Sequence, residues 1–306
     1  MTGTLSVVVI APELLHRKSV IGTAILESNK NIKVVARRDG HYQGTYRTIG
    51  LEIIAGENRL ETIHKEFDIK FKLNPGDVYF SVRSSTERKR IADLVAPGET
   101  VLVMFSGIAP YLLHIAKFSE ASTIIGIEKN RIAHRYAQEN LVLNKVKNRI
   151  ELFEGDVDEI VPQLDSQFDR IVMPLPKSSL EYLELALGHL RPGGVIHYYF
   201  IHPPDMLYQS VIELEKNVWQ QAGIWFTTRP LFADIPVPAP SGTVLMDGLY
   251  NRTFYRPMII IRIQSYNNIG KIKTRTRDTD EIQQTKRTDH FFRLHLTLVL
   301  FHYRAY

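Results

Sequence analysis

The sequence contains no cysteine. Disulfides, cysteine-ligated zinc, iron–sulfur clusters and a thiol nucleophile are therefore excluded. No apolar run approaches the roughly 20 residues of a membrane-spanning helix, and no signal-peptide pattern opens the sequence. The 11 histidines are scattered rather than grouped at the spacing of a metal site. We therefore expect a cytoplasmic protein with no membrane segment and no metal.

The balance of charge excludes less. The 306 residues include 38 Lys and Arg against 33 Asp and Glu, which gives a formal net charge of +5. This excess permits an anionic partner such as RNA without requiring one. With 44% hydrophobic residues, the chain is long enough for one large globular domain and a smaller one.

Residues 99–128 carry the most informative pattern of the chain. An apolar run at residues 100–105 reaches a turn at Gly107, and a second apolar run at residues 123–127 ends on Glu128. This pattern predicts a βαβ unit with a turn at which backbone can approach a ligand. A carboxylate at the carboxyl end of the second strand can accept hydrogen bonds from a ribose, so a nucleoside-bearing ligand is indicated.

The turn does not match a dinucleotide fingerprint, which needs three glycines. Only Gly107 is present, with Ala109 and Tyr111 at the other two places. A pyrophosphate is therefore disfavoured, and a nucleoside without phosphates, such as S-adenosyl-L-methionine, fits better. The alternative is a βαβ unit that binds no cofactor.

Later segments extend the same sheet. Strands are expected at residues 150–153, 168–173 and 195–201, and helices at residues 130–146, 158–164 and 178–190. Asp156 follows the first of these strands and can take the exocyclic amine of an adenine, and Pro174 follows the second. Alternating strands and helices predict a doubly wound, mainly parallel α/β sheet whose ligands bind at the carboxyl edge of the strands.

The N-terminal part has a different pattern. Strands are expected at residues 4–10, 31–35, 45–54 and 78–82, which predicts a small α+β domain. A helix is expected at residues 12–27, with an apolar face toward a sheet made of Leu14, Leu15, Val20, Ile21 and Ile25. Between two strands, residues 36–48 mix basic and aromatic side chains, among them Arg37, Arg38 and Arg47 around glycines. Such a segment suits phosphate contact and base stacking, although a solvated hairpin tip is the alternative.

Residues 81–95 predict a helix that leads into the larger domain. Glu87 lies in its first turn. It either interacts favourably with the helix dipole or acts as a general base.

Beyond residue 203 the patterns weaken. Residues 229–306 are expected to be an irregular extension that is partly polar and disordered, although residues 291–306 alternate as a strand does.

Residues 5–222 resemble the archaeal-type tRNA (guanine-37 N1)-methyltransferase family and its wybutosine-synthesis relative, which transfers an aminocarboxypropyl group. The matching motifs are GTYRTIGLEIIAGENRLETIHKE, VYFSVRSSTERKRIADLV, the cofactor stretch, LPK and RPGGVIHYY. The resemblance implies a tRNA-reading domain at residues 1–80 and a class I Rossmann-like methyltransferase domain at residues 81–228. The family's additional N-terminal domain for the tRNA elbow is expected to be absent, and a monomer is expected.

The resemblance also implies roles for residues. Arg47 in GTYRT matches the arginine that contacts guanine O6, and Glu87 in STER matches the glutamate proposed to remove the N1 proton. Pro174 stands where the family has an asparagine that holds the target base. The residues expected to bind S-adenosyl-L-methionine are Phe105, Ser106, Gly107, Ile108, Pro110, Glu128, Asp156, Val157, Leu175 and Pro176.

Two departures from the family keep three functions open. Val103 replaces an aspartate of the family's first cofactor strand, and Pro174 replaces the asparagine. The predicted function is tRNA N1-methylation of guanosine 37. The alternatives are aminocarboxypropyl transfer and a catalytically weakened tRNA-binding paralogue.

Overall fold

The computed structural model describes residues 2–175, 179–199, 260–266 and 291–297. The chain divides into two compact units, residues 1–166 and 167–306. The strands of the first unit are β1 (Leu5–Val8), β2 (Val34–Gln43), β3 (Thr48–Gly56), β4 (Thr62–Glu66), β5 (Ile69–Leu73), β6 (Thr100–Met104), β7 (Thr123–Glu128) and β8 (Ile150–Glu154). Its α-helices are α1 (Lys18–Ser28), α2 (Ser85–Asp93), α3 (Pro110–Phe118), α4 (Arg131–Leu143) and α5 (Val157–Ile160). Its 3₁₀ turns are η1 (Pro12–Arg17), η2 (Val82–Ser84), η3 (Lys147–Arg149) and η4 (Val161–Gln163).

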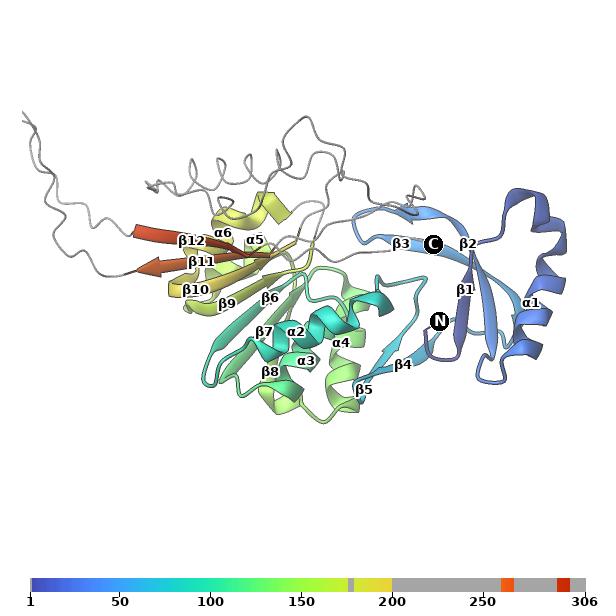
Figure 1. The fold of residues 1–306 in the computed structure, drawn as a ribbon, viewed down its shortest axis with the longest axis horizontal. Helices are drawn as coiled ribbons and strands as arrows, with labels where there is room; N and C mark the ends of the chain where they lie inside the picture. Colours follow the sequence, from blue (N-terminus) through green and yellow to red (C-terminus); the bar gives the residue numbers. More distant parts are fainter. Residues whose placement is uncertain (1, 176–178, 200–259, 267–290, 298–306) are drawn as a thin grey trace, which may run out of the picture. The chain divides into compact units, whose positions relative to one another are not determined.

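The N-terminal sheet has the order β1-β2-β3, in which β1 is parallel and β3 antiparallel to β2. Its core consists of Leu5, Val34 and Ala36, against which Leu51 and Ile53 pack. Helix α1 lies against β3 (Figure 1).

Helix α1 does not bury the face that the sequence predicted. The helix predicted at residues 12–27 is divided into η1 and α1; Leu14 of η1 is 44% exposed, Val20 of α1 is 70% exposed, and Gly22 is the only buried residue of α1. A Cβ on Gly22 would lie 2.8 Å from the Cβ of Ala55. The helix therefore meets the strand at its glycine, and the predicted apolar face is wrong for Leu14 and Val20.

The antiparallel hairpin β4–β5 was not predicted. Its second strand buries Ile69, Phe71 and Leu73 and turns Lys70 and Lys72 outward, which is the alternation of a half-buried strand. The strand predicted at residues 78–82 is wrong, because these residues form no strand and lead into η2.

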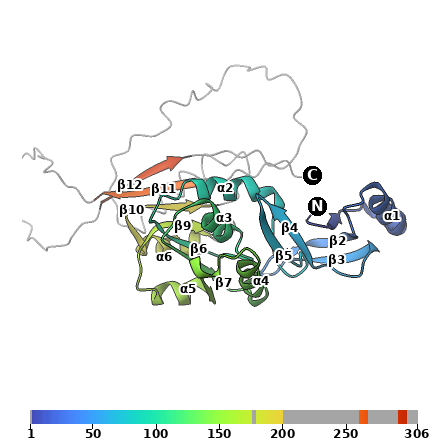
Figure 2. The ribbon, with the colours of Figure 1, turned by 90° about the horizontal axis from the view of Figure 1, so that it is seen from below.

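Strands β6, β7 and β8 pair in parallel. Four of the five residues of β6 are buried, as expected of a strand covered on both faces. Gly126 in β7 permits close packing, because a Cβ there would collide with Leu112 of α3. Helices α2 and α3 pack side by side (Figure 2).

The second unit contains the strands β9 (Phe168–Met173), β10 (Leu190–Tyr198), β11 (Ile260–Tyr266) and β12 (Phe291–Thr297), with η5 (Ser179–Tyr182) and α6 (Leu183–Gly188). Strands β9 and β10 are parallel, and β10 begins five residues before the predicted position 195 through a register shift between Leu190 and Val195. Strands β11 and β12 form an antiparallel pair within the segment that was expected to be irregular.

Parallel strands joined by helices confirm the predicted Rossmann-like α/β class, preceded by a small α+β part. The boundaries at residues 80 and 228 stay predictions. Within the described ranges, no helix combines the length and the hydropathy that crossing a bilayer requires.

Candidate functional site

The turn between β6 and α3 has the backbone conformation of a strained ligand loop. Phe105, Gly107 and Ala109 have φ angles of 57°, 57° and 72°. Two of the three are not glycine, and each such residue costs about 1–3 kcal/mol of strain. The backbone N–H of Ser106 donates to the carbonyl of Ile127 at 2.8 Å, which ties the turn to β7. Strain that the surrounding structure maintains is typical of a functional loop.

Glu128, at the end of β7, holds this turn in place. Its Oε2 accepts a hydrogen bond from the backbone N–H of Gly107 at 2.7 Å, and its Oε1 accepts one from the N–H of Asn130 at 2.7 Å. Burial raises the pKa of the carboxyl group, although these backbone hydrogen bonds oppose the shift. One carboxylate therefore fixes both the turn and the start of α4.

Asp156 lies beyond the end of the neighbouring strand, β8. Its Oδ1 caps α5 by accepting from the N–H of Asp158 at 3.3 Å, and Lys129 Nζ lies 2.5 Å from its Oδ2. The Lys129 ammonium lowers the pKa of Asp156. The N–H of Gly155 donates to the Glu128 carbonyl at 3.0 Å, which brings the two strand ends together.

The residues at these strand ends fit a nucleoside. An added Cβ on Gly107 would have no atom within 4 Å, so the space beside the glycine is open. The hydroxyl of Ser106 is buried and has no hydrogen-bond partner among the described residues. Open space and two carboxylates together suit a polar, hydroxyl-bearing ligand, whereas the Ser106 hydroxyl lies toward Gly126 of β7.

The remaining predicted cofactor residues fall into two groups. Ile108 is buried in the turn, Pro110 is the first residue of α3, and Val157 is buried at the start of α5. Leu175 follows β9 in the second unit, after Pro174, which was predicted for the catalytic site rather than for the cofactor, and Pro176 lies outside the described residues.

Glu87, the predicted base, is buried in the first turn of α2 with 3% of its surface exposed. Both of its oxygens accept from the Arg90 guanidinium, at 2.7 Å each. This bidentate pair fixes the orientation of the carboxylate. Arg90 was not predicted as a partner of Glu87, although the i,i+3 spacing of the two residues indicates such a pair.

Arg47, the predicted contact to guanine O6, lies in the turn between β2 and β3. It adopts a φ of 52°, and its guanidinium carbon lies 4.3 Å from the centre of the Tyr79 ring. A cation held over an aromatic face is restrained in position but keeps its N–H donors.

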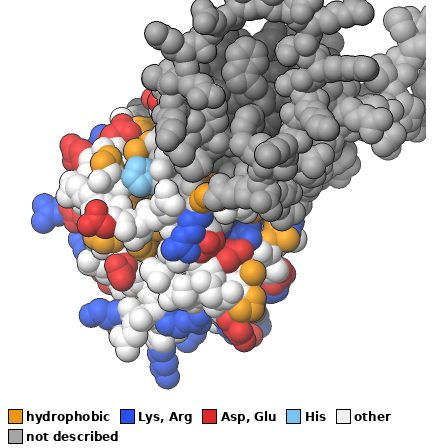
Figure 3. All heavy atoms as spheres, turned by 90° about the vertical axis from the view of Figure 1, so that its left-hand side faces the viewer, with side chains coloured by type: hydrophobic (Ala, Val, Ile, Leu, Met, Phe, Trp, Pro, Cys, Tyr) orange, Lys and Arg blue, Asp and Glu red, His pale blue; other side chains and the backbone are white. Residues whose placement is uncertain are grey.

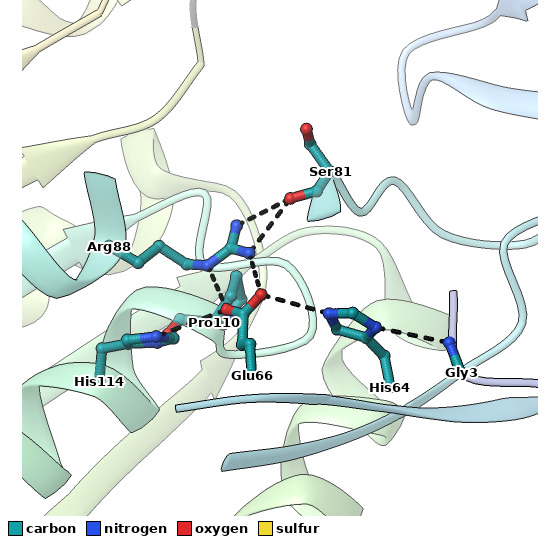
Figure 4. A network of polar contacts seen from close by, with 7 residues as sticks. All are labelled: Gly3, His64, Glu66, Ser81, Arg88, Pro110 and His114. Atoms are coloured by element: carbon teal, nitrogen blue, oxygen red, sulfur yellow. Dashed lines mark hydrogen bonds and ion pairs between the residues drawn. The ribbon is translucent and has the colours of Figure 1, made fainter. Parts of the chain in front are cut away.

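A buried polar network, also missed, joins β4 to α2 and α3 (Figure 4). Arg88 donates to both oxygens of Glu66 at 2.8 and 2.7 Å, and its two terminal nitrogens donate to the Ser81 carbonyl at 3.1 Å. His64 and His114 each place a ring nitrogen 3.4 Å from a Glu66 oxygen. Burial by itself raises the pKa of Glu66, but the hydrogen bonds from His64 and Arg88 outweigh it and lower the pKa.

This network holds the helix turn that carries Glu87, the predicted general base. Arg88 is the neighbour of Glu87 and is 2% exposed, so its pair with Glu66 anchors the first turn of α2. Removing one partner of such a buried pair costs about 3–5 kcal/mol, because the other charge is left buried and unpaired.

The same network does not form a metal site. The described part of the chain contains no group of three or more His, Asp or Glu side chains placed to hold a metal ion. His64, Glu66 and His114 do converge, but Arg88 already occupies both Glu66 oxygens.

Comparison with known protein families gives two matching family models. A family model described as the TRM5/TYW2 methyltransferase domain matches residues 62–224, and one described as the TYW2 N-terminal domain matches residues 1–59.

Three relatives represent the similarity. The tRNA (guanine(37)-N(1))-methyltransferase Trm5b of Pyrococcus abyssi is 39% identical over 72% of this chain and 65% of its own length. Its crystal structure has a TM-score of 0.65 at 38% identity, over 73% of this chain and 66% of that chain. A tRNA(Phe) (4-demethylwyosine(37)-C(7)) aminocarboxypropyltransferase of Methanocaldococcus jannaschii is 34% identical over 59% of this chain and 71% of its own length. The structure of P. horikoshii TYW2 in complex with MeSAdo has a TM-score of 0.61 at 28% identity, over 72% of this chain and 78% of that chain. The chain thus spans just under two thirds of the length of the first of these relatives.

Proposed function

The chain belongs to the TRM5/TYW2 methyltransferase family, and from this membership we propose that it is an S-adenosyl-L-methionine-dependent tRNA methyltransferase that modifies N1 of guanosine 37 in the anticodon loop. The observation that carries the proposal is the turn of residues 105–109, closed by the Glu128 carboxylate and flanked by Asp156. The 39% identical relative, itself a tRNA (guanine(37)-N(1))-methyltransferase, supports guanosine 37 as the modified nucleoside.

In this proposal the residues of the turn hold the nucleoside end of the cofactor. Glu128 accepts from the ribose hydroxyls, and Asp156 accepts from the adenine amine. The complex of the P. horikoshii relative with MeSAdo supports a nucleoside ligand in this family. The bound cofactor supplies an electrophilic methyl group and needs no metal.

Guanine N1 is a weak acid, so its alkylation requires a base while negative charge builds on O6. Glu87 takes the N1 proton, and Arg47 stabilises the charge on O6. Arg90 holds the Glu87 carboxylate in a bidentate pair, which fixes its orientation. Tyr79 restrains the Arg47 guanidinium through a cation–π contact, which uses none of its N–H donors.

The two departures from the family concern different steps. Val103 is fully buried in β6, where its apolar side chain suits the core. The aspartate that it replaces is therefore not available to the cofactor. Pro174 offers no side-chain amide to hold the target base, so base positioning depends more heavily on Arg47 and Glu87.

The tRNA partner is part of the proposal. Figure 3 shows one face of the molecule, on which Lys and Arg side chains are scattered among Asp and Glu rather than gathered in a basic patch. Residues 36–48 remain the better candidate surface. In this segment Arg37 forms ion pairs with Glu52 and Asp39, and Arg38 Nε donates to the Gly40 carbonyl at 3.1 Å.

One observation favours a second function, aminocarboxypropyl transfer to a modified guanosine. Residues 1–59 match the TYW2 type of N-terminal domain, and one relative is an aminocarboxypropyltransferase. The cofactor is the same in both reactions, and only the carbon that is transferred from its sulfonium differs.

The deciding experiment uses two tRNA samples, one from cells that lack guanosine-37 modification and one that carries 4-demethylwyosine at position 37, the acceptor named for the aminocarboxypropyltransferase relative. Each is combined with S-adenosyl-L-methionine labelled either in the methyl group or in the carboxyl group. After incubation with the full chain, nucleosides are separated and identified by mass spectrometry. Methyl label in 1-methylguanosine supports the proposed function, and carboxyl label supports the second. Cofactor and tRNA binding without transfer of either label would indicate a catalytically weakened tRNA-binding paralogue.

A further inference from the structure

Strand β5 pairs with β4 through one edge, and its remaining backbone groups at Lys70 and Lys72 are bonded by side chains of α4 and its C-cap rather than by a further strand. Asn140 Oδ1 accepts from the N–H of Lys72 at 2.7 Å, and Asn140 Nδ2 donates to the Lys72 carbonyl at 3.1 Å. Asn144 makes the same two contacts with Lys70, at 2.9 and 2.7 Å. Each side-chain amide thus imitates the residue that a neighbouring strand would supply.

The spacing explains why two asparagines suffice. Four residues along a helix rise about 6.0 Å, and two residues along a strand rise about 6.6 Å. Residues 140 and 144 therefore match residues 72 and 70 in an antiparallel sense. Asparagine is a poor helix former, at about 0.5 kcal/mol below alanine, so Asn140 within α4 requires a structural reason, whereas Asn144 is the C-cap of the helix.

Asn140 differs from Asn144 in its last contact. Its Nδ2 also donates to the carbonyl of Ile108 at 3.2 Å, within the turn that Glu128 closes. The Nδ2 of Asn144 donates instead to the Asn140 carbonyl of its own helix at 2.8 Å. Asn140 is 0% exposed, and it alone of the two joins the hairpin to the turn.

We propose that Asn140 is a positioning residue of the cofactor turn, which couples the turn to the β4–β5 hairpin. The inference rests on the proposed function, because it takes the turn to be the cofactor site. The hairpin also carries Glu66, whose pair with Arg88 anchors the candidate base. The β4–β5 hairpin therefore contacts both parts of the proposed site. Asn140 links it to the cofactor turn, and Glu66 links it to the helix turn that carries the proposed general base, Glu87.

The test compares Asn140→Asp with the matched control Asn144→Ala in the full chain. Aspartate keeps the acceptor for the Lys72 N–H but loses the donor to the carbonyls of Lys72 and Ile108; the control, which removes both contacts to Lys70, accounts for the lost contact to β5. Binding of S-adenosylhomocysteine is measured by calorimetry, and backbone hydrogen exchange in residues 105–109 is measured without ligand. Asn140→Asp is expected to raise Kd about fivefold, the equivalent of one lost hydrogen bond, and to speed exchange in the turn. Asn144→Ala removes a β5 contact of the same kind and is expected to leave both quantities unchanged.

Equal effects of the two substitutions would overturn the inference, since the contacts to β5 alone would then explain them. Wild-type exchange and affinity in Asn140→Asp would overturn it as well, and so would failure of this variant to fold, because Asn140 would then be a requirement of the fold. A wild-type chain that does not bind S-adenosylhomocysteine would refute the proposed function. In that case the exchange measurement, which needs no ligand, still decides the inference.

Discussion

Replacing His114 with phenylalanine is expected to destabilise the folded chain at pH 7 but to stabilise it at pH 5. His114 is fully buried on α3, and its ring lies near the rings of Phe67, Phe71 and Phe118. Its Nδ1 lies 2.8 Å from the Pro110 carbonyl, which can only accept, so Nδ1 carries the hydrogen. Burial lowers the pKa of His114 from 6.5 to about 4, although the Pro110 carbonyl and the Glu66 charge oppose the shift.

The magnitude follows from the two protonation states. At pH 5 the unfolded chain binds a proton at this histidine, whereas the folded chain, with its lowered His114 pKa, does not. Each pH unit over which only the unfolded chain is protonated costs about 1.4 kcal/mol of folding free energy. Between pH 6.5 and pH 5 the wild type should therefore lose about 2 kcal/mol through His114. The phenylalanine variant loses the hydrogen bond to Pro110, worth about 1 kcal/mol at any pH, but has no proton to bind.

The variant should thus be about 1 kcal/mol less stable than wild type at pH 7 and about 1 kcal/mol more stable at pH 5. Urea unfolding followed by circular dichroism at both pH values measures this difference. The pKa of His134 is also lowered by burial, but this residue is present in both proteins and cancels in the comparison. The lowered pKa of Glu66 affects stability only as the pH falls below the ordinary value of 4.5, outside the measured window. A stability difference with the same sign and size at both pH values would refute a neutral, buried His114.

Three further substitutions test the proposed site. Glu87→Gln should cut turnover by roughly 10²–10⁴-fold and leave cofactor affinity intact, since the amide keeps the shape but cannot take a proton; single-turnover assays with wild-type rates would reject the base assignment. Glu128→Ala should weaken cofactor binding by about 1.5–3 kcal/mol in calorimetry, and an unchanged affinity would exclude the ribose contact. Arg37→Ala should reduce the salt dependence of tRNA affinity by about one unit of slope if Arg37 contacts a phosphate. An identical slope would mean that its ion pair with Glu52 is its main role.

The sequence predicted the fold best where a single physical requirement dominates. Strands β6 and β7 are largely apolar and buried because parallel strands are covered on both faces, and the strands from β6 to β9 lie close to the predicted positions. The hairpin β4–β5 was missed because it is short and half-buried, with lysines at alternate positions that suggest a solvated segment. The apolar face of α1 was assigned by counting hydrophobic residues, whereas the helix packs through Gly22, which such counting ignores.

The positions of Glu128 and Asp156 at the ends of neighbouring strands were predictable from the sequence, but the buried hydrogen-bonded pairs around the candidate site were not. Glu128 and Asp156 could be identified because the carboxyl ends of parallel strands converge by topology. The partners Arg88 and Glu66 lie 22 residues apart. No periodicity connects such positions, so only the folded chain shows that they pair. The same is true of Asn140 and Ile108, which are separated by 32 residues.

The acidic groups assigned to the site share one property that bears on how the site works. Glu128 is held by backbone N–H groups that include those of Gly107 and Asn130, Glu87 by Arg90 and Asp156 by Lys129. None of the three has to be ordered when a ligand arrives, so the side-chain entropy that binding normally costs, about 0.5–1.5 kcal/mol for each group, has already been lost on folding. Glu128→Ala therefore removes a ligand contact and also releases the N–H of Gly107, which loosens the strained turn. The loss of affinity in this variant should exceed that in Glu128→Gln, which keeps an oxygen for one of the two backbone groups.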